Sequence, residues 1–368
     1  MKLGLICRPY SFHGGVETAT AGLLSELLKR GYAVDLLSTA RQPDVPGAQV
    51  RRLPTVAGPS VLRFVSFALA ARHAVRRGAY DIVQSHERTL EQDLYRAGEG
   101  THRGYLRAMG RRPGPTQVFH RLICAMEARI FRLETARHIV AISERDKTEI
   151  ERLYETPPER VSVVYNGVDL ERFHPDNRAR FGPAMRTGLG LRKDDWVVVF
   201  VGSGFERKGL GTLIEALAGW RDGSWRCAVA GKGDPAPYQR QATALGIGDR
   251  VRWLGPRRDV DRLYAMADVV ALPALYEPFG NVHLEALAAG VPVLASARSG
   301  GAEVVHHRET GWVAEPTVPQ VAEGLGALRD LRAPDVAALA RKSAEPFTCA
   351  AQAEGFTRIY RSLTGHRG

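Results

Sequence analysis

The sequence is poor in cysteine: its 368 residues include four, and these stand far from one another. Cys7, Cys124, Cys227 and Cys349 make none of the closely spaced pairs that are typical of zinc sites. We therefore expect four reduced, buried thiols and no structural zinc ion.

Long hydrophobic runs are also missing. No apolar stretch approaches the roughly 20 residues that a helix needs to span a bilayer. The opening residues, MKLGLICRPYSF, have the pattern of a strand followed by a loop rather than that of a signal peptide. Together these absences predict a protein without a membrane-spanning helix that stays in the cytosol.

Acidic residues are fewer than basic ones. The sequence has 40 Asp and Glu residues and 51 Lys and Arg residues, which gives a formal net charge of +11. An excess of positive charge favours nucleic acid, anionic lipid or an anionic substrate as a partner. Aromatic residues are not interleaved with the basic runs and no nucleic-acid-binding motif is present, so we expect no nucleic-acid partner. An anionic membrane surface or a glycolipid fits the charge better.

The positive charge is concentrated in residues 103–137, which hold eight arginines and only two acidic residues. Within this region, residues 118–133 show apolar positions at helical spacing with arginines between them. A basic amphipathic helix of this kind can lie on an anionic membrane. The same pattern is equally typical of a helix that packs its apolar stripe into the core, and the sequence leaves both interpretations open.

Length and periodicity predict an α/β fold with two domains. Hydrophobic residues make up 44% and charged residues 25% of the chain, which is ordinary globular composition. Short apolar strands alternate with helical patterns, and the continuous apolar run at 196–201 is typical of a parallel strand buried on both faces. We expect domains at 1–168 and 169–346, followed by a last helical segment at 347–368. Residues 178–195 lack an apolar period and are predicted to form a linker.

The most informative stretch is residues 276–293, YEPFGNVHLEALAAGVPV. A helix is expected from about residue 281 to 289, with Glu277 in the loop before it and Glu285 about one turn inside it. Glu285 can there accept a hydrogen bond from a ribose hydroxyl. A capped surface helix that happens to carry two glutamates is the alternative. The residues between the carboxylates present backbone N–H groups at a helix start, which suits a diphosphate; they are Phe279, Gly280, Asn281 and Val282.

A second basic element follows the strand at 196–201. Arg207 and Lys208 lie in a glycine-rich loop, with Gly204 near its start, between this strand and the next helix. Fixed cations at this place suit a diphosphate leaving group, because arginine offers a planar fork and lysine a point charge. A solvated turn is the alternative for an isolated Arg-Lys pair.

The first half of the chain begins with a strand, the pair Gly14 and Gly15, and a helix. Adjacent glycines indicate either a tight turn or a close approach of the backbone to an anion or a sugar. The pattern is not G-x-G-x-x-G, which excludes a nicotinamide dehydrogenase of the Rossmann type.

Three further polar residues in the first half are candidates for binding. His86 follows a strand at 80–84, at the strand end where ligands bind in open parallel sheets. Glu99 and His102 lie in residues 95–115, which are predicted to form a strand that ends in a polar loop. The histidines lack the spacing of a metal site. A solvated loop is the alternative for each of the three.

Three sequence segments resemble motifs of a known family: EPFGNVHLEALAAGVPV, GSGFERKG and NGVDLERFHP. They resemble the E-x7-E, the G-x-x-x-x-R-K-G and the interdomain motifs of glycosyltransferase family 4, the retaining enzymes of the GT-B type. The resemblance covers essentially the whole chain. It implies two Rossmann-like domains whose parallel sheets face each other across a deep cleft, and a last helix that crosses back to the first domain. The nearest pattern is that of lipopolysaccharide core glucosyltransferase I, which uses UDP-glucose.

The resemblance also implies roles. The first domain binds the acceptor and the second binds the nucleotide-sugar, whose sugar contacts Glu277. Glu99 stands at an acidic position where the core glucosyltransferases are expected to have Asp. The residues expected to take part in catalysis are Glu277, Lys208, Arg207 and Glu99. Those expected to bind substrate are Gly14, Gly15, Glu17, His86, His102, Gly204, Gly231, Leu254, Phe279, Gly280, Asn281, Val282 and Glu285.

These features predict transfer of a hexose, with glucose from UDP-glucose as the first choice, to a hydroxyl of a lipid-linked glycan such as lipopolysaccharide core. Retention of configuration is implied by the resemblance. No D-x-D motif stands at a strand end, so we expect no metal, and no cofactor besides the nucleotide-sugar. We expect a cytoplasmic protein, peripheral on the inner face of the membrane and in contact with it through residues 103–137. The alternatives are a mannosyl-, galactosyl- or N-acetylhexosaminyltransferase of cell-surface glycan assembly, and a non-catalytic protein that binds a nucleotide-sugar or a lipid.

Overall fold

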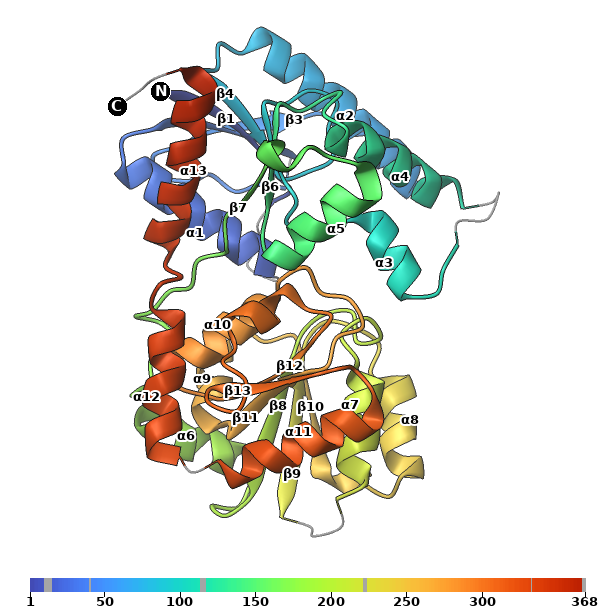
Figure 1. Ribbon diagram of the computed structural model, residues 1–368, viewed down its shortest axis with the longest axis vertical. Helices are drawn as coiled ribbons and strands as arrows, with labels where there is room; N and C mark the ends of the chain where they lie inside the picture. The colour runs from blue at the N-terminus through green and yellow to red at the C-terminus, as the bar shows by residue number, and fades with distance from the viewer. Residues whose placement is uncertain (10–14, 40, 113–116, 221–223, 332, 366–368) are drawn as a thin grey trace. The chain divides into compact units, whose positions relative to one another are not determined.

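The computed structural model describes residues 1–9, 15–39, 41–112, 117–220, 224–331 and 333–365 (Figure 1). The chain divides into two compact units. The first unit comprises Met1–Gly167 and Cys349–Gly368, and the second comprises Val168–Thr348. The C-terminal helix α13 (Cys349–Thr364) therefore belongs to the first unit.

The first unit is built on a parallel sheet of seven strands in the order β3-β2-β1-β4-β5-β6-β7. Strand β1 pairs with β2 on one side and with β4 on the other, so the strand order reverses there. The strands are β1 (Lys2–Ile6), β2 (Ala33–Thr39), β3 (Gln49–Leu53), β4 (Ile82–Ser85), β5 (Leu94–Arg96), β6 (His138–Ala141) and β7 (Val161–Val163).

Helices cover both faces of this sheet (Figure 1). On one face α1 (Gly15–Lys29) and α13 contact each other and share a core with the strands, in which Leu24 and Phe356 are buried. On the other face lie α2 (Ser60–Arg77), α4 (Val118–Phe131) and α5 (Glu144–Tyr154). Alternate residues of each strand thus meet different helices, as a parallel sheet buried on both faces requires.

The second unit has a parallel sheet of six strands in the order β10-β9-β8-β11-β12-β13, the doubly wound order. Its strands are β8 (Trp196–Val201), β9 (Trp225–Ala230), β10 (Val251–Gly255), β11 (Val269–Leu272), β12 (Val293–Ser296) and β13 (Gly311–Ala314). Its helices are α6 (Asn177–Gly188), α7 (Leu210–Ala218), α8 (Ala236–Ala244), α9 (Val260–Met266), α10 (Asn281–Ala288), α11 (Val318–Asp330) and α12 (Ala333–Ala344). The prediction of an α/β fold with two parallel sheets is confirmed.

One predicted linker is wrong. Residues 178–195 contain most of helix α6, which packs against α9. The guanidinium groups of Arg178 and Arg186 lie 2.7 and 2.6 Å from the two carboxylate oxygens of Asp268. These ion pairs link the helix to the segment before β11, and they leave no trace in hydrophobic periodicity. Helix α6 could therefore not be predicted from the apolar pattern of the sequence, because ion pairs help to hold it in place.

The predicted polar loop at 95–115 is also partly wrong, because it contains helix α3 (His102–Ala108). Thr101 caps this helix by accepting a hydrogen bond from the N–H of Gly104 at 3.0 Å. The buried carboxylate of Glu127, on α4, accepts from the N–H groups of His102 and Arg103 at 2.6 and 3.1 Å. Seven residues with little apolar content give no periodic signal, so the caps define this helix.

Three expectations about the chain can be compared with the structure. None of the four cysteines, all of which the structure describes, forms a disulfide; Cys7 and Cys227 are buried as expected, whereas Cys124 and Cys349 are only half-buried. The apolar stripe of α4 faces the core, with Ile123 and Ile130 buried. Within the described part of the chain, none of the helices combines the length and hydrophobicity that crossing a bilayer requires.

Candidate active site

One charged part of the predicted site lies where β8 and β11 end. These neighbouring parallel strands occupy the point at which the strand order of the second unit reverses. Ligands of doubly wound sheets bind outside the carboxyl ends of the strands at such a point. The loop after β8 carries Arg207 and Lys208, and the loop after β11 carries Glu277. The topology therefore brings two segments about 70 residues apart in sequence together.

Arg207 and Lys208 converge on one oxygen of Glu277. Arg207 Nη1 lies 2.9 Å and Lys208 Nζ 3.1 Å from Glu277 Oε2, and Arg207 Nη1 also donates to the carbonyl of Tyr276. Glu277 and Lys208 are both buried. Burial alone would raise the pKa of Glu277, but the charges and hydrogen bonds of Lys208 and Arg207 outweigh it and lower the pKa to about 2. Glu277 is therefore a carboxylate at physiological pH.

The loop that carries Glu277 is fixed from behind by the segment after β12. The carbonyl of Glu277 accepts from the N–H of Gly300 at 3.0 Å, and the carbonyl of Phe279 accepts from the hydroxyl of Ser299 at 2.9 Å. A Cβ at Gly301 would lie 2.3 Å from the carbonyl oxygen of Phe279, so only glycine permits this close approach. The loop is thus preorganised by backbone contacts.

Helix α10 begins beside this loop. Gly280 precedes it with φ +82° and, as a glycine, supplies no side-chain cap of its own. The helix start at Asn281 and Val282 therefore leaves room for an anion to take the place of a cap. Phe279 and Val282 are buried, which places apolar side chains around this helix end.

Glu285 has a partner that the sequence did not predict. The hydroxyl of Tyr264, which is fully buried on α9, donates to Glu285 Oε2 at 2.8 Å. Burial raises the pKa of Glu285, and the hydrogen bond from Tyr264 acts against this rise. Tyr264 therefore orients the carboxylate and favours its charged form. No pattern singles out Tyr264, because it lies at an ordinary core position of a short helix.

In the predicted role of Glu285 as a partner of the ribose, replacing Tyr264 by phenylalanine is expected to weaken nucleotide-sugar binding by about fivefold, because Glu285 loses a hydrogen bond worth about 1 kcal/mol. The loss should be larger at acid pH, since the pKa of Glu285 rises further without this donor. Calorimetric dissociation constants between pH 5 and 8 test this. Tyr238→Phe removes a hydroxyl elsewhere in the second unit and is the matched control; equal affinity of wild type and Tyr264→Phe would contradict the role.

Three further predicted residues lie around the β8–β9–β10 edge. Gly204 has φ +77° and accepts from the N–H of Lys208 at 3.2 Å, so it shapes the loop that holds the cations. Gly231 has φ +151°, and a Cβ there would lie 1.9 Å from the carbonyl oxygen of Gly202. Only glycine fits at position 231, because the ends of β8 and β9 approach each other closely there. Leu254 is half-buried in β10, and its contact with a base stays a prediction.

The first unit gathers charge at the carboxyl ends of β1, β4 and β5. Arg8 Nε lies 2.7 Å from Glu87 Oε1, and Arg8 Nη1 lies 2.9 Å from Glu99 Oε1. Arg88 pairs with Glu99 at 3.3 Å. Although burial opposes it, the charges of Arg8 and Arg88 lower the pKa of Glu99. Glu99 is therefore part of an ionic cluster that includes Arg8, Glu87 and Arg88, and of these the sequence analysis singled out only Glu99.

The predicted histidines have different partners. His86 is buried, with its ring nitrogens 3.0 Å from Thr20 Oγ1 and 2.6 Å from Gln84 Nε2, and burial lowers its pKa. His102 Nε2 lies 2.8 Å from His120 Nδ1, and the two rings stack. These contacts tie α1 to β4 and α3 to α4. The substrate-binding roles of both histidines stay predictions.

The remaining predicted residues lie at the start of α1. Gly14 lies outside the described residues. Gly15 begins α1 and Glu17 lies in its first turn, but their side chains lie outside the described part of the structure. Among the described residues, no group of three or more His, Cys, Asp or Glu side chains is arranged to hold a metal ion.

The sequence matches two family models, one in each half. Residues 13–172 match the model of Glycosyltransferase Family 4, and residues 183–333 match that of Glycosyl transferases group 1. A D-inositol 3-phosphate glycosyltransferase of Mycolicibacterium vanbaalenii is 30% identical over 378 residues, which cover 90% of this chain and 81% of that protein. An uncharacterized glycosyltransferase of Methanocaldococcus jannaschii is 27% identical over 346 residues, 88% of each chain.

Solved structures show the same fold. WaaG, a glycosyltransferase involved in lipopolysaccharide biosynthesis, superposes with a TM-score of 0.82 at 23% identity and covers 99% of this chain and 100% of its own. Anabaena Alr3699/HepE, in complex with UDP-glucose, has a TM-score of 0.75 at 20% identity and covers 98% of this chain and 100% of its own. At these identities the likeness concerns the fold alone. With the two family models and the relative at 30% identity, it follows that the chain belongs to glycosyltransferase family 4 and has the GT-B fold.

Proposed function

We propose that this glycosyltransferase moves a hexose from a nucleotide-sugar, with UDP-glucose as the first candidate, to a hydroxyl of a lipid-linked glycan. The observation that carries the donor site is the convergence of Arg207 and Lys208 on Glu277, beside the start of α10, which a glycine precedes. The structure of a relative of the same fold in complex with UDP-glucose supports this choice of donor. The second unit accordingly binds the donor, and the first unit binds the acceptor.

The chemistry follows from the charges. When the bond between the sugar and the diphosphate breaks, negative charge develops on the leaving phosphate. Arg207, Lys208 and the N–H groups at the start of α10 are fixed positive dipoles and charges that stabilise it. In this proposal the diphosphate replaces Glu277 as the partner of both cations, which frees the Glu277 carboxylate to hold hydroxyls of the donor sugar. Glu285 holds the ribose.

We further propose that the sugar keeps its anomeric configuration and that the reaction needs no metal ion. The acceptor hydroxyl attacks on the face from which the diphosphate departs, and an oxygen of the leaving phosphate takes its proton. Two side-chain cations take over the charge neutralisation that a divalent ion would supply. Glu99, held by Arg8 and Arg88, lies in the unit assigned to the acceptor, where it can accept a hydrogen bond from an acceptor hydroxyl.

A phosphorylated polyol is the second candidate acceptor. Several relatives at 30–32% identity are named D-inositol 3-phosphate glycosyltransferase, and they cover 81–90% of this chain. A galactosyl, mannosyl or N-acetylhexosaminyl donor is the corresponding alternative for the sugar. Both alternatives keep the donor diphosphate on Arg207 and Lys208.

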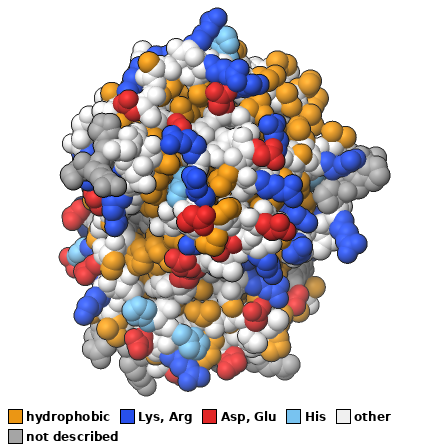
Figure 2. Space-filling view, turned by 45° about the horizontal axis from the view of Figure 1, so that its top comes forward, with side chains coloured by type: hydrophobic (Ala, Val, Ile, Leu, Met, Phe, Trp, Pro, Cys, Tyr) orange, Lys and Arg blue, Asp and Glu red, His pale blue; other side chains and the backbone are white. Residues whose placement is uncertain are grey.

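Peripheral contact with an anionic membrane, on its cytoplasmic face, is part of the proposal. On α2, Leu62 and Leu69 are 52% and 53% exposed, and Val118, at the start of the neighbouring α4, is 56% exposed. The basic region at 103–137 lies in the same unit. Figure 2 shows hydrophobic side chains gathered in the upper right of the view with Lys and Arg among them. Exposed apolar residues flanked by arginine are the composition of an interfacial surface.

A thermal-shift screen with UDP-, GDP- and ADP-sugars, first without metal and then with Mg²⁺ or Mn²⁺, tests the donor site. A ligand present at 100 times its dissociation constant stabilises the folded state by about 2.7 kcal/mol. We expect one UDP-sugar to raise the melting temperature without metal, and Glu285→Ala to abolish the effect. A screen in which no nucleotide-sugar shifts the transition would favour a non-catalytic protein, and a shift that appears only with metal would overturn metal independence.

A further inference from the structure

The ionic cluster of the first unit contains a second accessible carboxylate, Glu87, to which the proposed reaction gives no role. Arg8 bridges the two acids. Its Nε and Nη2 lie 2.7 and 3.2 Å from the two carboxylate oxygens of Glu87, and its Nη1 lies 2.9 Å from Glu99 Oε1. The side chains of Glu87 and Glu99 are 19% and 38% exposed. Both carboxylates can therefore meet a ligand at the carboxyl ends of β4 and β5.

The positive charge of this cluster is already neutralised. The mostly buried Arg88 lies 3.3 Å from Glu99 Oε2 and 3.0 Å from an oxygen of the fully buried Glu127. Burial raises the pKa of Glu87, and the charge of Arg8 acts against this rise. The charge balance does not depend on the result, because Glu99 and Glu127 alone offset both guanidinium groups. These five residues together therefore carry no surplus positive charge that would attract an anion.

Two helix starts at the same edge of the sheet are also occupied. At the start of α3, Thr101 accepts from the N–H of Gly104, and Glu127 accepts from the N–H groups of the first two helical residues. At the start of α5, the hydroxyl of Ser143 accepts from the N–H of Asp146 at 3.0 Å. A phosphate that binds at a helix start uses such N–H groups. Oxygens of the chain itself hold these places in the first unit, whereas α10 of the second unit is preceded by a glycine that supplies none.

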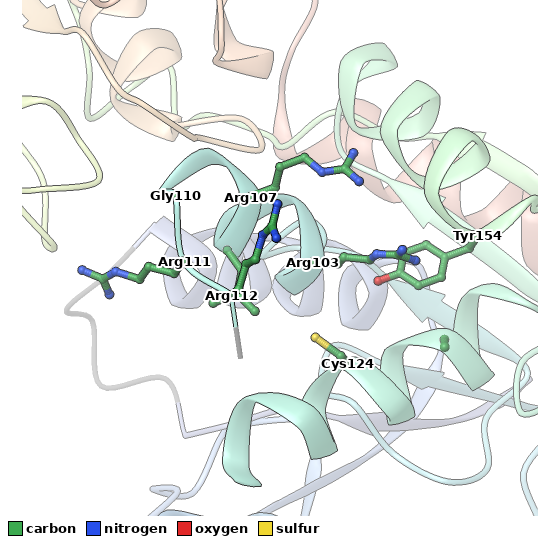
Figure 3. Close-up of a pocket in the computed structure, with 9 residues that line it drawn as sticks. Arg103, Arg107, Gly110, Arg111, Arg112, Cys124 and Tyr154 are labelled. Atoms are coloured by element: carbon green, nitrogen blue, oxygen red, sulfur yellow. The ribbon is translucent and has the colours of Figure 1, made fainter. Parts of the chain in front are cut away.

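Four other arginines of the first unit line a pocket of about 670 Å³ between α3 and α4 (Figure 3). They are Arg103, Arg107, Arg111 and Arg112. None of the residues of the ionic cluster is among those that line this pocket. The pocket is therefore a separate place at which a phosphate can be attracted, and a test of the cluster has to distinguish the two.

The position of Glu87 is fixed by its own loop. Its carbonyl accepts from Ser85 Oγ at 2.6 Å, and its N–H donates to the same hydroxyl at 3.2 Å. The carboxylate oxygens that Arg8 contacts keep lone pairs that can accept from hydroxyl groups. Arg8 thus holds two acceptors next to each other, which suits a sugar with neighbouring hydroxyl groups. A phosphate in the same place would face two carboxylates and be repelled by both.

We propose that Glu87 selects the acceptor of the transfer reaction. Together with Glu99 it accepts hydrogen bonds from hydroxyl groups of an uncharged sugar. By neutralising Arg8 it also rejects a sugar that carries a phosphate near the reacting hydroxyl. This inference rests on the proposed function, in which the first unit binds the acceptor, and it favours the glycan over the phosphorylated polyol. Specificity arises here from repulsion of the wrong ligand as well as from attraction of the right one.

Two probes that differ by one phosphate test the rejection. Binding of myo-inositol and of D-myo-inositol 3-phosphate to the full chain is followed by saturation-transfer difference NMR, without a nucleotide-sugar. We expect Glu87→Gln to raise the affinity for the phosphate by about tenfold or more, because a charge that repels the phosphate is lost and Arg8 is released. The affinity for myo-inositol should not rise. A Glu87→Gln variant that binds the phosphate no more tightly than the wild type does would overturn the proposal.

Further variants assign the gain to the cluster. Adding Arg8→Gln to Glu87→Gln should remove the gain, whereas adding Arg107→Gln should leave it, because Arg107 lines the separate pocket. Glu87→Asp keeps the charge and should bind the phosphate as weakly as the wild type does. A gain that survives Arg8→Gln, or that disappears with Arg107→Gln, would place the phosphate outside the cluster and overturn the proposal. Melting temperatures of all variants check that each one is folded.

A competition between acceptors tests the selection in the wild type, without any variant. Octyl glucoside and octyl glucoside 6-phosphate are offered together at equal concentration with UDP-glucose, and the products are quantified by mass spectrometry. We expect the wild type to favour the uncharged acceptor by about tenfold or more, and Glu87→Gln to reduce this preference by about tenfold. Glu91→Gln changes another glutamate that is paired with arginine, outside the cluster, and should leave the preference unchanged. Equal or faster transfer by the wild type to the phosphorylated acceptor would overturn the proposal.

The two proposals can fail separately. The binding series needs neither donor nor transfer, so it decides on the selection by Glu87 even when neither octyl acceptor reacts. The thermal shift with a nucleotide-sugar tests the donor site of the second unit and should be unchanged in Glu87→Gln. A thermal shift without the expected gain in phosphate affinity therefore contradicts only the role of Glu87, and a gain without a thermal shift contradicts only the transfer function.

Discussion

Glu277→Ala is expected to lower the rate of sugar transfer by roughly 10²–10³, at saturating donor. In the free protein Glu277 Oε2 holds both Arg207 and Lys208, so the carboxylate keeps the two cations in place before the donor arrives. In the proposed complex the diphosphate takes over both cations, and Glu277 holds hydroxyls of the sugar as the glycosidic bond breaks. Initial rates of product formation measure the effect. Full activity of Glu277→Ala would remove Glu277 from the reaction.

A stability measurement distinguishes a lost catalytic contact from a disturbed fold. The pKa of Glu277 is about 2, below the ordinary 4.5, so its carboxylate stabilises the folded unit above pH 4.5, and this contribution disappears as pH falls from 4.5 to 2. Glu277→Gln should therefore lower the free energy of unfolding by about 3 kcal/mol at neutral pH and by almost nothing near pH 2. Glu309→Ala, at an exposed position of the same unit, is the control and should change neither rate nor stability much.

The motif residues could be identified because the sequence around them resembles motifs of a known family. Their contact with one another could not be predicted from the sequence. Arg207 and Glu277 are 70 positions apart, and they touch because β8 and β11 are neighbours in the sheet. Strand order is a property of the whole fold rather than of either loop. The same reason explains why Arg8, Glu87 and Arg88 were not grouped with Glu99, since Arg8 follows β1, Glu87 and Arg88 follow β4, and Glu99 follows β5.

The structure departs from the sequence-based predictions where polar contacts replace hydrophobic periodicity. Helix α6 is linked through Arg178 and Arg186 to one aspartate, and α3 is defined by caps from Thr101 and Glu127. Periodicity registers apolar faces, so it found α4 and missed these two helices. Tyr264 was missed for the opposite reason. It looks like an ordinary core residue, and only the position of its hydroxyl beside Glu285 gives it a role.

Lys208→Ala is expected to lower the transfer rate by a similar factor, roughly 10²–10³, because the leaving diphosphate loses a buried point charge. Lys208 is 9% exposed, and its chain crosses Gly202, where a Cβ would lie 2.3 Å from Lys208 Cδ. The space beside Gly202 thus accommodates the unbranched side chain of Lys208. Lys208→Arg should restore little activity, since a planar fork does not fit the place of a compact ammonium group.

Lys232→Ala is the matched control, because Lys232 is an exposed lysine in the neighbouring loop after β9. Its loss should leave the rate nearly unchanged. A double-mutant cycle then tests whether Lys208 and Glu277, whose charged atoms lie 3.1 Å apart, act as one unit. The double variant should be scarcely slower than the slower single variant, since each change already disables the shared charge centre. Rate losses that multiply would mean that the two residues contribute independently, and that their contact in the free protein has no part in the reaction rate.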